Sequence, residues 1–239
     1  MNNLQKLTDD AGFGDSNLSS GELGDINILI GINGGGKTTL LESVYRQINS
    51  VISSTNSDIN VCFLREEDIE GYEADIISIF NSIINEKGRY LDNTLKLIQS
   101  IYPTIVDLSV SYDDRMLYVH FKDSKIPFNG MGAGFYSIVR IIAGVWLARG
   151  GCLLIDNLGR GLHLDSTDKV CDYVIESVAQ DNTQVFISTH CPTCLSGFRS
   201  DGRGFRSSDI ESNLKTTVID VKSAYQLPND VIDAEISNF

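Results

Sequence analysis

The sequence lacks the features that mark membrane, secreted and nucleic-acid-binding proteins. Its longest apolar run, residues 141–148, lies between Arg140 and Arg149 and is too short to span a bilayer. The N-terminal segment carries only Lys6 as a basic residue and has no apolar core, so we expect no secretory signal. With 19 Lys and Arg against 32 Asp and Glu, the net charge is −13, and no basic run stands out. Direct binding of nucleic acid by this chain alone is therefore disfavoured, and any such contact is expected only through a complex.

Cysteine is present without the spacing of a disulfide framework. The five cysteines are an odd number, which is typical of a reducing cytosol rather than of a disulfide scaffold. Cys191 and Cys194 form one C-x-x-C pair, but a zinc site needs a second pair or two histidines. We expect this pair to cap a loop rather than to bind a metal or to act as a redox pair. The sequence predicts a soluble cytoplasmic protein with no membrane partner.

A glycine-rich segment near the N-terminus carries the strongest functional signal. Residues 31–38, GINGGGKT, satisfy the phosphate-loop pattern G-x-x-x-x-G-K-[ST] and stand between an apolar strand (25–30) and the start of a helix. Such a loop wraps backbone N–H groups around a polyphosphate at a helix N-terminus. Lys37 is expected to reach the β- and γ-phosphates, and the Thr38 hydroxyl to ligate Mg²⁺. The predicted nucleotide-binding residues of the loop are Asn33, Gly34, Gly35, Gly36, Lys37, Thr38 and Thr39.

Strand and helix patterns alternate along much of the chain. Residue periodicity predicts helices at 75–84, 91–101 and 134–149, and a further helix that Ser166 caps. Apolar segments predict strands at 59–64, 105–110, 116–121, 152–155 and 184–188. We interpret this as an α/β fold of the P-loop NTPase type, with a mostly parallel central sheet flanked by helices and a small antiparallel β and helical lobe.

A carboxylate follows the apolar strand at 152–155. A phosphate loop needs such a group from a neighbouring strand to complete the Mg²⁺ shell, and Asp156 has the right position. The expected cofactors are therefore ATP and Mg²⁺.

Three further segments resemble those of one family. Residues 155–163, IDNLGRGLH, resemble the block that follows the Mg²⁺ strand in ABC-type ATPases of the overcoming-lysogenization-defect (OLD) and RecF/SMC-like group. Residues 126–134 resemble the family's signature segment, and 187–192, ISTHCP, resemble its switch motif. Together with the phosphate loop, these segments make four blocks in the family's order.

The resemblance implies a role for each matching residue. His190 would sense the γ-phosphate, and Gly132 and Gly134 of the signature segment would face the γ-phosphate bound by a second subunit. Such ATPases dimerise head to tail with two nucleotides between the protomers, which implies an ABC-type ATPase head and a homodimer for this chain. His163 would be structural and would order the loop after the Mg²⁺ strand.

One residue departs from the family's pattern at a catalytic position. Asn157 stands where the family has the glutamate that polarises the attacking water. An amide can orient a water but cannot accept its proton near neutral pH, and loss of such a base commonly costs on the order of 10²–10⁴-fold in rate. We expect ATP·Mg²⁺ binding with slow hydrolysis, in which Lys37, Asn157 and His190 are the catalytic candidates. Asp165 lies nearby in sequence as a substitute carboxylate that nothing yet ties to the site.

These observations leave three functions open. The first is an ATPase module that dimerises on ATP and switches a partner effector, such as a nuclease, in DNA metabolism or anti-phage defence. The second is an ATP-dependent assembly protein that does not hydrolyse ATP. The third is the soluble subunit of a transporter, which the absence of the serine-bearing transporter signature disfavours. We expect one domain, with a nucleotide core at 25–64 and 126–195, an inserted lobe at 65–125 and a partly mobile tail at 199–239.

Overall fold

The computed structural model describes residues 23–65, 73–198 and 214–221, and within these ranges the chain forms two sheets and their covering helices. The central sheet has five parallel strands in the order β2-β6-β7-β1-β8. They are β1 (Ile26–Ile30), β2 (Val61–Leu64), β6 (Cys152–Ile155), β7 (Gln184–Ser188) and β8 (Thr216–Asp220). The predicted α/β fold with a mostly parallel sheet is confirmed.

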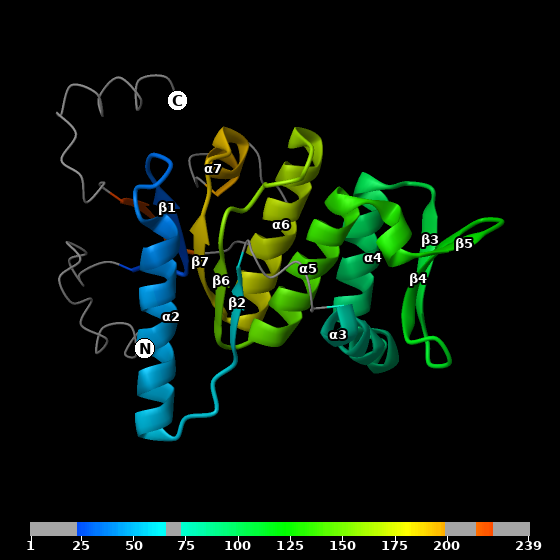
Figure 1. The fold of residues 1–239 in the computed structure, drawn as a ribbon, viewed down its shortest axis with the longest axis horizontal. Coiled ribbons are helices and arrows are strands. Elements are labelled where there is room, and N and C mark those ends of the chain that lie inside the picture. Colours follow the sequence, from blue (N-terminus) through cyan, green and yellow to red (C-terminus); the bar gives the residue numbers. More distant parts are fainter. Residues whose placement is uncertain (1–22, 66–72, 199–213, 222–239) are drawn as a thin grey trace.

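Helices cover both faces of this sheet, which gives three layers (Figure 1). On one face lies α2 (Lys37–Thr55), and on the other lie α5 (Ala133–Ala148) and α6 (Leu164–Asp181). Alternate side chains of β6 serve the two faces: Leu154 packs with Leu41 and Val44 of α2, whereas Leu153 and Ile155 join the larger core on the other side. The strands read as continuous apolar runs because both of their faces are buried.

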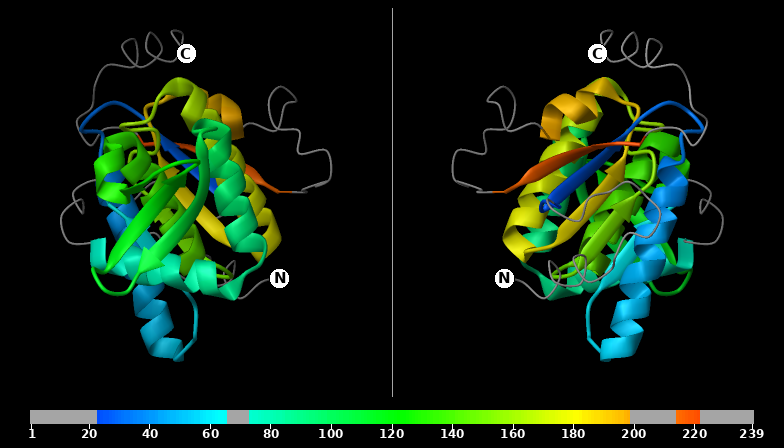
Figure 2. Two further views of the ribbon diagram at one scale, coloured as in Figure 1. Left: turned by 90° about the vertical axis from the view of Figure 1, so that its right-hand side faces the viewer. Right: turned by 90° about the vertical axis from the view of Figure 1, so that its left-hand side faces the viewer.

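A second group of elements packs beyond α5 and forms the far end of the molecule (Figures 1 and 2). It consists of α3 (Glu73–Glu86), α4 (Arg89–Ile101) and an antiparallel sheet of β3 (Ile105–Ser111), β4 (Met116–Phe121) and β5 (Lys125–Pro127). Its apolar residues, Phe80 and Ile98 among them, belong to the same core cluster as α5. A short 3₁₀ turn, η1 (Phe128–Met131), leads back from β5 to α5.

Two features of the fold differ from the sequence-based expectation. The helix after β6 begins at Leu164 with His163 as its N-cap, so the prediction that Ser166 caps it is wrong. The amide of Ser166 already donates to the His163 carbonyl at 2.9 Å, while His163 Nδ1 accepts from the Asp165 amide at 3.4 Å. A side-chain acceptor three residues earlier thus serves the free amides of the first turn.

The C-terminal segment contributes a strand that we did not predict. We expected a partly mobile tail at 199–239, and residues 199–213 and 222–239 lie outside the described part of the chain. Between them, β8 pairs with β1 from Ile26↔Thr216 to Ile30↔Asp220. The strand that precedes the phosphate loop therefore has a parallel neighbour on each side, β7 and β8.

Within 23–65, 73–198 and 214–221, no helix combines the length and the apolar character that a membrane crossing requires.

Candidate nucleotide-binding site

A pocket of about 390 Å³ opens at the carboxyl edge of the central sheet. Three segments meet there: the phosphate loop after β1, residues 156–157 after β6, and residues 188–190 at the end of β7. They converge because β7 pairs with both β6 and β1 in parallel, so all three strands end at the same edge. The lining residues are Asn33, Gly34, Gly36, Lys37, Thr38, Thr39, Asp156, Asn157, Ser188 and His190.

The phosphate loop has a backbone conformation that favours glycine at two positions. Gly34 and Gly36 have φ angles of 75° and 95°, in the left-handed region that side chains disfavour. A Cβ at either position would meet nothing within 4 Å, so open space faces the loop there. Gly35 is the predicted loop residue that does not line the pocket, and its amide donates to the Ile32 carbonyl at 3.0 Å within the loop. The geometry leaves a cradle at the start of α2 for a group that accepts hydrogen bonds.

Lys37 lies under this cradle and is 6% exposed. Its Nζ donates to the carbonyls of Gly31 at 2.7 Å and Ile32 at 2.9 Å, so the loop itself holds the ammonium group. Burial lowers the pKa of Lys37, and the charge of Asp156 opposes that shift. A polyanion in the cradle would add to the effect of Asp156 and stabilise the charged form.

Both oxygens of the Asp156 carboxylate are engaged. The Thr38 hydroxyl donates to Asp156 Oδ2 at 2.9 Å, and the Ser188 hydroxyl donates to Oδ1 at 2.5 Å. Ser188 Oγ also accepts from the Asn157 amide at 2.8 Å. One buried hydroxyl therefore fixes the carboxylate and the backbone of the next residue, and ties β6 to β7 at the mouth of the pocket.

Asn157 and His190 complete the wall of the pocket. Asn157 has a φ of 58°, a conformation that Asn tolerates better than most residues with a side chain. The pKa of His190 is lowered by partial burial and then by the charge of Lys37, and Asp156 acts in the opposite direction. The His190 imidazole is therefore mostly neutral at pH 7, a state in which one ring nitrogen can donate and the other accept.

Most of the chain matches a known protein family. The family described as AAA ATPase domain matches residues 42–195, a stretch that starts on α2 just after the phosphate loop and ends within α7 (Pro192–Phe198). This chain belongs to the AAA ATPase domain family. It is an ATPase domain with the fold of a P-loop NTPase. Among curated proteins, no relative matches it.

A solved structure offers a weaker likeness. A chain of an ABC transporter, described as of metal-chelate type and in an inward-facing conformation, is 17% identical with a TM-score of 0.38. The match covers 72% of the present chain and 64% of the transporter chain.

The donor set of this AAA ATPase domain suits Mg²⁺. The Thr38 hydroxyl and the Asp156 carboxylate supply oxygen atoms, and this hard cation prefers oxygen ligands together with phosphate and water. Mg²⁺ bound there would neutralise phosphate charge. No group of three or more His, Cys, Asp and Glu side chains in the described ranges could itself hold a metal ion.

The signature glycines lie elsewhere. Gly132 is the N-cap of α5, and Gly134 stands in its first turn, where a Cβ would be 3.2 Å from the Gly161 carbonyl. Neither residue lines the pocket, whereas six of the seven predicted phosphate-loop residues, Asp156, Asn157 and His190 all do. The structure thus brings together the residues expected from one chain and leaves the signature segment apart.

Ser188 is a site residue that sequence reasoning missed. The sequence predicts Ser188 as the last residue of a strand and as part of the switch segment at 187–192, but assigns it no role in the site, although it is 1% exposed and its hydroxyl contacts Asp156. Its position carries a signal. The carboxyl ends of neighbouring parallel strands lie at the same edge of a sheet, so Ser188 at the end of one strand lies at the same edge as Asp156 directly after the other.

Proposed function

We propose that this chain binds ATP·Mg²⁺ in the pocket at the carboxyl edge and acts as a nucleotide-dependent switch with slow hydrolysis. The observation that carries this proposal is the convergence of Lys37, Thr38 and Asp156 below an open glycine cradle. In this proposal the amides of Gly34 and Gly36 and the Lys37 ammonium bind phosphate oxygens, which stabilises charge that develops at the γ-phosphate. Thr38 and Asp156 orient the metal ion.

Slow turnover is supported by the residue next to Asp156. Asn157 lines the pocket but carries an amide, which can orient a water without accepting its proton. Asp165, the other candidate carboxylate, is turned to solvent beside His163, with its side chain 87% exposed, and is not part of the pocket wall. In this proposal His190, which lines the pocket, contacts the γ-phosphate and reports whether it is present. Phosphoryl transfer depends mostly on placement and electrostatics, so the proposal is a slow enzyme rather than an inert one.

Head-to-tail dimerisation on ATP is the second part of the proposal. It rests on the resemblance to the OLD and RecF/SMC-like ATPases and is supported by the separation of Gly132 and Gly134 from the pocket. In such a dimer, the signature segment of one protomer would close the nucleotide site of the other. ATP would then control assembly, because the nucleotide lies between the two subunits.

The dimer would act on a separate effector, and the resemblance points to a nuclease in DNA metabolism or anti-phage defence. We propose the segment between Arg65 and Tyr102 of the inserted lobe as its docking region, because its helices α3 and α4 pack beyond α5, away from β1 (Figure 1). The alternative is an assembly protein that binds ATP without hydrolysis, and the amide at Asn157 is the observation that favours it.

Steady-state ATP turnover of the purified chain with Mg²⁺ tests the proposal, together with binding of a fluorescent ATP analogue. The control is Lys37→Ala, which removes the ammonium group from the loop. We expect ATP binding that depends on Lys37 and turnover well below one per second. Binding without turnover would favour the assembly protein, and Asn157→Glu would then be tested for gain of hydrolysis. Equal binding by wild type and Lys37→Ala would contradict the proposed site.

A further inference from the structure

Three cysteines meet directly behind the nucleotide pocket. Cys191 follows His190, Cys194 lies in the first turn of α7, and Cys171 faces them from α6; we call these three residues the thiol cluster. A Cβ placed on Gly159 would be 3.2 Å from Cys194 Sγ and 3.7 Å from Cys191 Sγ, so both sulfur atoms border the same small space. The sequence shows the C-x-x-C pair, but only the fold adds Cys171 and Gly159 to it.

The thiol cluster is bonded to the two segments that form the pocket wall. Cys194 Sγ donates to the Leu158 carbonyl at 3.6 Å, and that carbonyl also accepts from the Thr189 hydroxyl at 2.8 Å. Thr189 Oγ1 in turn accepts from the Cys191 amide at 3.0 Å. Leu158 is the residue after Asn157, and Thr189 and Cys191 flank His190. A change at the sulfur atoms therefore acts on the immediate chain neighbours of the pocket residues Asn157 and His190.

The chemistry of the cluster differs from that of the other cysteines. A hydrogen bond from Cys171 lowers the pKa of Cys194, and the same bond, together with burial, raises the pKa of Cys171. By contrast, burial raises the pKa of Cys62 to about 12 and raises that of Cys152 as well. Thiolate character decides thiol reactivity, so Cys194 is activated where Cys62 and Cys152 are inert. Cys191 is half-buried and is the member of the cluster that a small solute can reach.

The backbone places the pair close to the separation that a disulfide spans. Cys191 is the residue before α7, and its carbonyl accepts from the Leu195 amide at 3.2 Å, which closes the first helical turn. Residues three apart across such a turn have Cβ atoms about 5–6 Å from each other. A disulfide needs Cβ atoms at roughly 3.5–4.5 Å, so a modest closing movement of the turn is sufficient.

We propose that Cys191 and Cys194 form a reversible disulfide that couples the redox state of the thiol cluster to the nucleotide pocket. The oxidant is a peroxide. The Cys191 thiolate attacks one peroxide oxygen, the O–O bond breaks, and Cys191 becomes a sulfenic acid while hydroxide leaves. The Cys194 thiolate then attacks the Cys191 sulfur, the S–S bond forms and a second hydroxide leaves. Two thiols have lost two protons and two electrons, and hydrogen peroxide has become two waters; a dithiol reductant reverses the change.

Oxidation changes the pocket because it removes a donor and moves the turn. Cys194 gives up the proton that it shares with the Leu158 carbonyl, and its sulfur moves toward Cys191 beneath Gly159. Gly159 has a φ of 96°, and a Cβ there would be 3.2 Å from Cys194 Sγ and 3.7 Å from Cys191 Sγ, so we expect a movement of the two sulfur atoms to displace the 158–159 segment. We expect the oxidised chain to bind ATP·Mg²⁺ less tightly, on the order of tenfold. This consequence rests on the proposed nucleotide-binding function, whereas formation of the disulfide does not.

The test uses the full chain, reduced and then treated with hydrogen peroxide. Alkylation of the remaining thiols followed by peptide mass mapping locates the disulfide, and titration with a fluorescent ATP analogue and Mg²⁺ measures affinity. In wild type we expect a Cys191–Cys194 disulfide and an affinity loss of about tenfold that dithiothreitol reverses. Cys191→Ser should form no such disulfide and should keep its affinity in peroxide. Cys62→Ala, a change at a cysteine outside the cluster, should behave as wild type.

Several outcomes would overturn the proposal. A peroxide-treated wild type with free Cys191 and Cys194, or with Cys171 joined to Cys194, would show that the pair is assigned wrongly. A Cys191–Cys194 disulfide without any change in ATP affinity would disprove the coupling. If the reduced wild type binds no ATP analogue, the proposed function and the coupling fail together, and mass mapping alone still decides whether the disulfide forms.

Discussion

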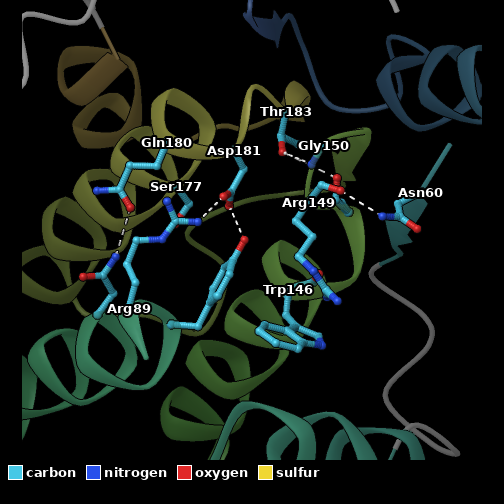
Figure 3. Close-up of polar contacts among 12 residues, drawn as sticks. Asn60, Arg89, Trp146, Arg149, Gly150, Ser177, Gln180, Asp181 and Thr183 are labelled. Atoms are coloured by element: carbon cyan, nitrogen blue, oxygen red, sulfur yellow. Dashed lines mark hydrogen bonds and ion pairs between the residues drawn. The ribbon is translucent and has the colours of Figure 1, made fainter. Parts of the chain in front are cut away.

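The two edges of the central sheet use polar side chains in opposite ways. At the carboxyl edge, Lys37, Asp156 and Ser188 surround an open pocket, and their hydrogen bonds leave a cradle of glycine backbone facing the space between them. At the other edge, where the chain enters β2, β6 and β7, polar and charged groups pair with each other across helix ends (Figure 3).

The paired edge is built from two small groups. Asp181, at the end of α6, accepts from Arg89 and from the Tyr90 hydroxyl, the latter at 2.6 Å. Arg149 lies with its guanidinium carbon 3.9 Å from the centre of the Trp146 ring, and its carbonyl accepts from Asn60 at 2.8 Å. These contacts join α4, α5, α6 and β2 and leave the charges there with partners of their own (Figure 3).

The comparison of the two edges distinguishes polar side chains that stabilise the fold from polar side chains that can bind a ligand. A group whose donors and acceptors are met by fixed neighbours stabilises the fold, because leaving such a group unpaired is costly. A polar group that its neighbours hold in place beside an open pocket can still bind a ligand, and those neighbours need not rearrange. The same residue type, aspartate, takes both roles here, and substitutions at the two edges should therefore have different effects.

The largest effect is expected for Asp156→Asn at the open edge. The substitution keeps the size of the side chain but removes the charge that would face Mg²⁺, and affinity for Mg²⁺ in the presence of ATP should fall on the order of 100-fold or more. Titration of Mg²⁺ at a fixed concentration of a fluorescent ATP analogue measures this. If binding of the ATP analogue by the variant depends on Mg²⁺ concentration as it does in wild type, Asp156 does not bind the metal ion.

A smaller effect is expected for Ser188→Ala. The change removes the donor to Asp156 and the acceptor for the Asn157 amide, so Mg²⁺ affinity should fall about 10-fold, the lower end for groups that orient a ligand. The same titration measures it. Ser177→Ala is the matched control, because Ser177 is a buried serine of α6 whose hydroxyl donates to the Tyr173 carbonyl away from the pocket. Equal losses in both variants would indicate a general packing effect.

At the paired edge, Asp181→Asn should change stability and leave the nucleotide site alone. The carboxylate is mostly buried while Arg89 is 45% exposed, so solvent screens much of the ion pair, and we expect a loss of about 1–2 kcal/mol in the free energy of unfolding. Urea unfolding checks this, and the fluorescent ATP analogue should bind as it does to wild type. A large loss of ATP affinity would show that the two edges are not independent.

The smallest effect concerns Asp172, midway along α6 between the two edges. Burial, followed by the charges of Glu176 and Asp168, raises the pKa of Asp172 to about 7, above the ordinary value of 3.8. The folded state therefore holds a proton that the unfolded state loses, so this group's contribution to stability is present below pH 4 and is lost as pH rises to about 7.

Asp172→Asn removes this dependence. Allowing for solvent screening, the variant should be more stable than wild type by about 1 kcal/mol at pH 8, with the difference vanishing toward pH 4. Thermal unfolding from pH 4 to pH 8 measures it, and Asp75→Asn at an exposed position of α3 serves as control. A constant difference across this range would contradict the assignment.

Sequence reasoning predicted the open edge better than the rest because its chemistry restricts the residues. A loop that curls around phosphate requires glycine at Gly34 and Gly36, and a metal-binding strand end requires a carboxylate such as Asp156, so both leave a local signature. The helices with one apolar face were also predicted within a few residues, as α3 and α4 show.

Features that depend on long-range packing could not be predicted in the same way. Strand β8 is short and mixes Thr with apolar residues, and its pairing with β1 is determined by contacts far along the chain. The role of Ser188 depends on which strands are neighbours, and the sequence predicts strands but not their order. The start of α6 was misplaced because His163, an uncommon cap, takes the place that Ser166 would fill three residues later.

Strand β1 has a consequence for the order in which this protein is made. Its partners are β7 and β8, so the pairing of Ile26 is complete only after Val185 and then Thr216 have been synthesised. The end of β8 also supports the phosphate loop directly, since a Cβ on Gly31 would be 2.6 Å from the Val221 carbonyl. A ribosome that adds ~5–20 residues per second makes the two segments about ten seconds or more apart. The phosphate loop is therefore synthesised well before the segments that complete the pairing of the strand it follows.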